Sequence, residues 1–275
     1  MSYASLMANV ELGQSNRCLL QVTGDIAARF DSELVGASAY QPLRMLYGEG
    51  MLSPAPFEQD RENIELQMRD AEVGFRQALE SIDSALSWRS TTAFALPTDW
   101  LAREARAADL LIASVPADPY PDAARRVDLG SLVMQAGRPL LLVPEGIEQL
   151  ALTQVVVGWS DTREARRAIR DALPLLKQAT QVIVVEVAVD ESLDSARHHV
   201  EDVARWLKAH GVAAKTFELT PSGVDAVQLR RFAEDHQADL IVAGAYGHSR
   251  LLEWAFGGVT RDLLLRADCC ALLSH

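Results

Sequence analysis

The chain has 275 residues, 49% of them hydrophobic, so it can bury one large core or two ordinary ones, and extended disorder is excluded. Its formal net charge of −12 argues against general nucleic-acid binding, because phosphate contacts need concentrated lysine and arginine, and we find no such run. Three cysteines, two of them adjacent, form no disulfide framework, and the start of the sequence has neither a basic leader nor a long apolar segment, so we expect a cytoplasmic protein without a membrane span.

The first half of the chain alternates between strand and helix patterns. A helix is predicted at 15–30, a loop with proline and glycine follows at 40–57, and a long helical pattern continues from Glu58 to about Trp88. Short apolar runs predict strands at 5–10, 33–39, 91–96, 109–114 and 139–143.

The second half repeats this course with clearer signals. Its strands are predicted at 153–159, 181–187, 212–219, 239–244 and 270–274. Segments with helical spacing separate these strands. In the first, apolar residues from Ala165 to Leu173 lie on one face. Further helices are predicted at 190–211, 224–236 and 257–267, and Gly211 ends the helix at 190–211. Strict alternation of strand and helix predicts an α/β fold whose mostly parallel sheet is covered on both faces.

An internal repeat relates the two halves. "AADLLIASVP" at 107–116 is echoed by "QADLIVAGAY" at 237–246, and each is followed, after a similar interval, by a second apolar run. We therefore predict two tandem domains, 1–147 and 151–275, with the boundary in the polar interruption at 144–152.

Glycines gather at two places that suit a phosphate ligand. Gly244 and Gly247 follow the fourth strand of the second half, and Gly257 and Gly258 open the helix before the fifth. Glycine lets a ligand approach the backbone, and the amides of a helix start favour an anion. In an open parallel sheet the ligand crevice lies at the carboxyl ends of the strands, where the strand order reverses.

The spacing of Gly244, Gly247 and Gly257 resembles the G-x2-G-x9-G-(S/T) signature of the universal stress protein (UspA-like) family. The segment "VVVGWSDTREARRAI" is similar to the family's first strand and helix, and the two-half layout is similar to its tandem members. The resemblance implies two Rossmann-like, adenine-nucleotide alpha hydrolase-like domains, each a five-stranded parallel sheet of order 3-2-1-4-5. It also implies a stress-response or signalling protein that binds ATP, with or without magnesium.

The resemblance places the nucleotide site in the second domain. In the first domain prolines and acids replace the glycines, and only Gly130 and Ser131 match the motif, so we expect a degenerate site there. His248 and Arg250 suit phosphate, although an exposed loop pair is equally expected to be solvated. The predicted binding residues are Ser160, Asp161, Val187, Gly244, Gly247, His248, Arg250, Gly257, Gly258, Val259 and Thr260.

Two departures from the pattern keep other functions open. Gly258 stands where ATP-binding members have serine or threonine, and Ser160 stands where an aspartate reads adenine. One alternative is a nucleotide-free tandem scaffold with both sites degenerate. Another is a slow ATP hydrolase, for which Asp161 is the carboxylate nearest the expected site. No phosphate-binding P-loop is present, and we predict neither a catalytic residue nor a metal site.

Several features receive structural interpretations. Cys269 and Cys270 begin a strand and are expected to pack on opposite faces, and the adjacent His198 and His199 are expected on a solvated helix surface. The final strands of the two domains are expected to pair, giving an intramolecular pseudo-dimer that could also form a homodimer. The 58–88 helix is expected either to cap the vacated first site or to bind a partner.

Overall fold

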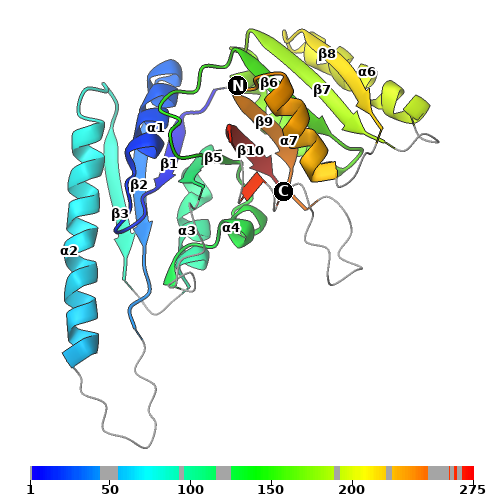
Figure 1. Cartoon of the computed structure of the whole chain (residues 1–275). Coiled ribbons are helices and arrows are strands. Elements are labelled where there is room, and N and C mark those ends of the chain that lie inside the picture. Colours follow the sequence, from blue (N-terminus) through cyan, green and yellow to red (C-terminus); the bar gives the residue numbers. More distant parts are fainter. Residues whose placement is uncertain are drawn as a thin grey trace, which may run out of the picture.

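The computed structural model describes residues 2–43, 55–92, 96–115, 125–188, 193–220, 225–246, 260, 263–264 and 268–275. The described strands form one sheet with the order β3-β2-β1-β4-β5-β10-β9-β6-β7-β8 (Figure 1). The first half of the chain contributes β1 (Ser5–Asn9), α1 (Arg17–Phe30), β2 (Glu33–Ala39), α2 (Ala55–Ala78), β3 (Leu86–Thr91), α3 (Pro97–Glu104), η1 (Ala105–Ala107), β4 (Leu110–Ser114), α4 (Leu129–Gln135) and β5 (Leu140–Val143).

The second half runs from β6 to β10. Its elements are β6 (Gln154–Trp159), α5 (Arg163–Leu176), β7 (Gln181–Val187), α6 (Leu193–Ala209), β8 (Ala214–Leu219), α7 (Asp225–Asp235), β9 (Leu240–Gly244) and β10 (Cys270–Ser274). These bounds agree closely with the predicted strands. Gly211, just after α6, has φ +85°, the left-handed conformation expected of a glycine that ends a helix.

Both halves have the predicted strand order 3-2-1-4-5, which confirms the α/β fold class. They join where β5 and β10 pair antiparallel, with Leu141 opposite Leu272. The pairing expected between the final strand of each half is therefore found. It covers two strand edges that would otherwise expose unpaired backbone groups, and it makes the sheet continuous across the chain.

The predicted long helix is wrong at its C-terminal end. Helix α2 stops at Ala78, and the residues up to Trp88 include strand β3, which lies about five residues before the strand predicted at 91–96. Leu79, Ile82 and Leu86 continue the helical spacing beyond the end of α2, so periodicity did not mark the boundary. Helices α3 and α4 were also not predicted.

The core has two layers, one on each face of the sheet. Helices α1, α2, α5 and α6 cover one face, and α3, α4 and α7 cover the other. Cys270 belongs to the first layer and Cys269 packs against the second, so the expectation of packing on opposite faces is confirmed. Burial raises the pKa of both thiols to about 12, so neither is a reactive thiolate near neutral pH. In the described ranges, no helix combines the length and the hydropathy that a bilayer crossing requires.

Candidate functional site

The predicted site lies at the carboxyl ends of β6 and β9. These are the first and fourth strands of the second half, and they pair side by side up to Gly158 and Ala243. Ser160 follows β6 and Gly244 ends β9, so the structure brings both predicted residues to the point where the strand order reverses.

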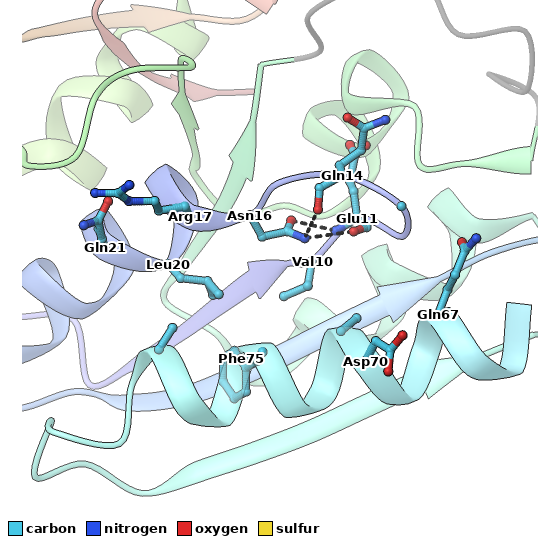
Figure 2. Close-up of a pocket in the computed structure, with 14 residues that line it drawn as sticks. Val10, Glu11, Gln14, Asn16, Arg17, Leu20, Gln21, Gln67, Asp70 and Phe75 are labelled. Carbon is cyan, nitrogen blue, oxygen red and sulfur yellow. Dashed lines mark hydrogen bonds between the residues drawn. The ribbon is translucent and has the colours of Figure 1, made fainter.

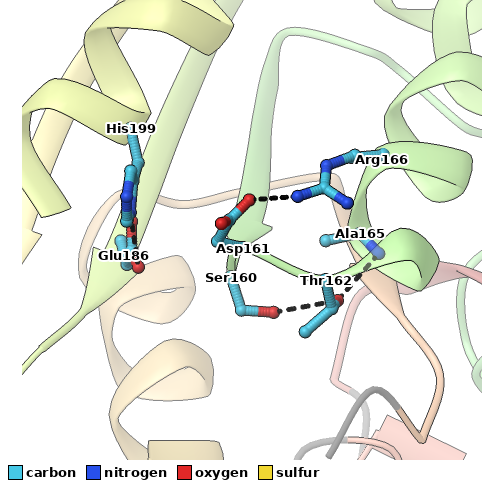
Figure 3. Close-up of polar contacts among 7 residues, drawn as sticks. All are labelled: Ser160, Asp161, Thr162, Ala165, Arg166, Glu186 and His199. Atoms are coloured by element: carbon cyan, nitrogen blue, oxygen red, sulfur yellow. Dashed lines mark hydrogen bonds and ion pairs between the residues drawn. The ribbon is translucent and has the colours of Figure 1, made fainter. Parts of the chain in front are cut away.

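A short polar turn connects β6 to helix α5 at this edge. The Thr162 hydroxyl caps the helix by accepting a hydrogen bond from the Ala165 amide at 3.2 Å. The Ser160 and Thr162 hydroxyl oxygens lie 3.4 Å apart (Figure 3). Two hydroxyls and the positive end of a 14-residue helix therefore meet at the strand ends, an arrangement that favours an anionic ligand.

Asp161 is already engaged with a cation of the same helix. Its carboxylate forms an ion pair with Arg166, and the two side chains are 54% and 57% exposed (Figure 3). In the part of the chain that the structure describes, no group of three or more histidine, cysteine or acidic side chains is arranged to hold a metal ion. A magnesium ion at Asp161 would compete with Arg166 for this carboxylate.

A carboxylate and an imidazole that the sequence analysis did not assign to the site also lie at this edge. Glu186, near the end of β7, has its carboxylate 3.3 Å from the His199 ring on α6. Burial raises the pKa of Glu186; His199 opposes that shift, and Asp161 adds to it. The expectation of a solvated surface holds for the exposed His198 and is wrong for the half-buried His199. An acidic residue inside the apolar run "QVIVVEV" is the signal that could have revealed this pair.

Gly244 has a packing role that the sequence did not reveal. A Cβ at this position would lie 2.6 Å from the Ala165 amide nitrogen and 2.7 Å from the Glu164 carbonyl carbon, both backbone atoms of α5. The strand end therefore approaches the helix start so closely that only glycine fits. This contact holds β9 against the N-terminus of α5, whether or not a ligand binds there.

The remaining predicted residues divide into described and undescribed. Thr260 is 1% exposed, and its hydroxyl accepts a hydrogen bond from the Tyr246 amide at 3.0 Å. Val187 ends β7 and is half-buried beside Glu186. Six predicted residues lie outside the described ranges, and their roles stay predictions: Gly247, His248, Arg250, Gly257, Gly258 and Val259.

The corresponding edge of the first half is closed by its own side chains. Arg126 pairs with Glu11 at 3.1 Å, and Arg125 pairs with Asp60 of α2 at 2.7 Å. These four side chains are 14–16% exposed. Both guanidinium groups lie over the Tyr40 ring, at 4.8 and 5.5 Å from its centre. Helix α2 therefore helps to cap this edge, one of the two roles expected for the inserted helix.

A separate hollow of about 580 Å³ lies between α1 and α2 (Figure 2). The amide of Asn16 closes the loop before α1 by donating to the Glu11 carbonyl at 2.9 Å and accepting from the Glu11 amide at 3.0 Å. The lining mixes apolar side chains such as Phe75 with amides and single charges such as Asp70. It has no concentration of cationic groups, so it does not resemble a phosphate site.

Comparisons with known proteins agree with this architecture. Residues 152–275 match the model of the Universal stress protein family, and no curated protein matches the sequence. A universal stress protein structure from Archaeoglobus fulgidus DSM 4304 covers 98% of this chain and 95% of its own, with 11% identity and a TM-score of 0.74.

Two structures from Pseudomonas aeruginosa also share the fold along the whole chain. A putative universal stress protein from strain UCBPP-PA14 is 17% identical over 99% of this chain and 93% of its own, with a TM-score of 0.64. A functionally unknown protein from strain PAO1 is 16% identical over 99% and 92%, with a TM-score of 0.58. Residues 152–275 therefore match the universal stress protein family model, and the chain as a whole shares the fold of these structures.

Proposed function

We propose that this protein binds one adenine nucleotide, ATP, at the carboxyl ends of β6 and β9, and acts as a nucleotide-dependent stress-response or signalling protein. The observation that carries the proposal is the asymmetry between the two strand-end edges. Two largely buried arginine–carboxylate pairs occupy the first-half edge. At the second-half edge, hydroxyls and the N-terminus of α5 meet beside an exposed ion pair and the Glu186–His199 pair.

The described residues supply complementary groups for such a ligand. The Ser160 hydroxyl and the first-turn amides of α5 donate toward phosphate or ribose oxygens. The Glu186 carboxylate, on the neighbouring strand β7, supplies an acceptor for the exocyclic amine of adenine. Ser160 has a neutral hydroxyl and cannot supply a charged acceptor. Gly247, Gly257 and Gly258 would let the phosphates approach the backbone.

The pairing of β5 with β10 supports a second element of the proposal. The two halves, with bounds near 1–147 and 151–275, act as a pseudo-dimer within one chain. A light-scattering mass near 30.1 kDa, that of one chain, is expected. A stable mass of two chains would show that two chains associate despite the internal pairing of the halves.

A nucleotide-free scaffold is the second candidate. It is favoured by the Asp161–Arg166 ion pair and by the buried Thr260 hydroxyl, because both groups already have partners within the chain. The two functions differ in whether the parent protein binds ATP at all.

Calorimetric titration with ATP and magnesium tests the proposal. We expect about one site per chain in the parent and loss of binding in Gly247→Val, whose side chain obstructs the phosphates. Gly74→Val is the matched control, because a Cβ at Gly74 of α2 has no neighbour within 4 Å and lies in the other half. Absence of binding in the parent, or equal loss in the control, would contradict a nucleotide site in the second half.

A further inference from the structure

A second cavity, of about 570 Å³, lies between the two halves and is distinct from the hollow beside α2. One wall consists of the residues preceding β1, β4 and β5, and the other is the exposed face of α5. Four arginines line it. Arg138 comes from the first half, and Arg166, Arg167 and Arg170 come from the second.

Three of these arginines form no ion pair with an aspartate or glutamate side chain in the described part of the chain. Arg138 donates to the Arg106 carbonyl at 2.9 Å, and Arg167 donates to the backbone oxygen of His275. Arg170 forms no hydrogen bond or ion pair with a described residue. The sequence has 38 acidic and 26 basic residues, so acidic side chains outnumber basic ones. Arginines without an acidic side-chain partner that line one cavity therefore suggest a bound anion.

Two carboxylates, Asp109 and Asp171, share the cavity with the four arginines. Asp109 is committed to the backbone, because one of its oxygens accepts hydrogen bonds from Ala4 and Ser5 at 2.8 and 3.1 Å. Asp171 is half-buried, and burial raises its pKa while Arg167, Arg170 and Arg138 act against the rise. The three guanidinium groups line the same cavity as Asp171, from both of its walls.

We propose that this cavity is a binding site for a small anion that carries a diphosphate group. Guanidinium groups match phosphoryl oxygens with paired N–H donors, and three that line one cavity from two walls match the charge of a diphosphate better than that of a single carboxylate. The site uses residues of both halves, so it exists only because β5 and β10 pair. It is separate from the nucleotide site proposed above, which uses the ends of β6 and β9.

Calorimetry with inorganic pyrophosphate at 0.15 M salt tests this site, in the Gly247→Val background to keep the other site silent. Arg138→Ala and Arg170→Ala should each weaken pyrophosphate binding about tenfold. Asp171→Asn should strengthen it about fivefold, because it removes a like charge. Arg69→Ala, an exposed arginine of α2 outside the cavity, is the matched control for net charge.

The outcomes separate a ligand site from a merely basic surface. Opposite effects of the arginine and Asp171 substitutions, with Arg69→Ala unchanged, support the site. ADP then distinguishes the two sources of the diphosphate group. Equal binding of ADP and pyrophosphate indicates that the site recognises the diphosphate alone, and tighter binding of ADP indicates a nucleotide. No binding of pyrophosphate, equal weakening in Arg69→Ala, or tighter binding of citrate would overturn the proposal. None of these results depends on whether the parent binds ATP at the ends of β6 and β9.

Discussion

The two halves of this protein share one topology and differ at the edge where such folds bind ligands. In the first half, a seven-residue connection at 10–16 separates β1 from α1, and Glu11 within it pairs with Arg126. In the second half, only 160–162 separate β6 from α5, and the helix start comes close enough to touch Gly244. The sheet therefore provides the same edge twice, while the connections and the inserted helix α2 decide what occupies it.

A glutamate near each edge extends the comparison. Burial raises the pKa of both Glu11 and Glu186, yet Arg126 accompanies the first and His199 the second. An arginine keeps its charge throughout the physiological range. The first edge is thus held by an arginine–carboxylate ion pair, and the second has a carboxylate beside an imidazole.

Exchanging one residue between the halves should have the largest effect. The sheet register places Ser114 of β4 at the position that Gly244 has in β9. Gly244→Ser should lower the free energy of unfolding by about 3 kcal/mol, because the new Cβ meets backbone atoms of α5. Ser114→Gly should cost only about 1 kcal/mol. Urea unfolding of both variants measures the difference, and equal costs would show that the close approach is not real.

The ion pairs of the two edges should differ in energy. Asp60→Ala leaves Arg125 largely buried without its carboxylate and should cost about 2 kcal/mol. Asp161→Ala removes an exposed pair and should cost at most about 0.5 kcal/mol. The comparison is made by urea unfolding at low and high salt. If Asp161→Ala costs as much as Asp60→Ala, the second edge is held as firmly as the first.

The smallest effect concerns the pH dependence of stability. A carboxyl whose folded pKa is raised binds protons more readily in the native state, so the free energy of unfolding falls as the pH rises from about 4.5 through the folded pKa. Glu186→Gln should flatten this slope at moderately acidic pH. Glu11→Gln should flatten it also, since burial raises that pKa too. An unchanged slope in both variants would contradict the assignment of raised pKa values, irrespective of their absolute stabilities.

Regular elements were predictable where the local pattern agreed with burial. Strands β7 and β10 have their predicted bounds because continuous apolar runs end at polar residues. The end of α2 was not predictable, because its apolar spacing continues through Ile82 toward an edge strand whose residues are only partly buried. Ser160 and Gly244 lie at one edge of the sheet, as the strand order implied by the family resemblance predicted.

The sequence by itself indicated an α/β fold, two similar halves and the second-half strand ends as the candidate site, because periodicity and repeat spacing are local properties of the chain. The strand order was an expectation from the resemblance to a known family. Only the tertiary structure decided the partners of the charged groups. Arg125 meets Asp60 across 65 positions, Arg126 meets Glu11 across 115, and Arg138 shares a cavity with Arg170 because two distant strands pair. Such contacts depend on how the elements pack, which no local pattern contains.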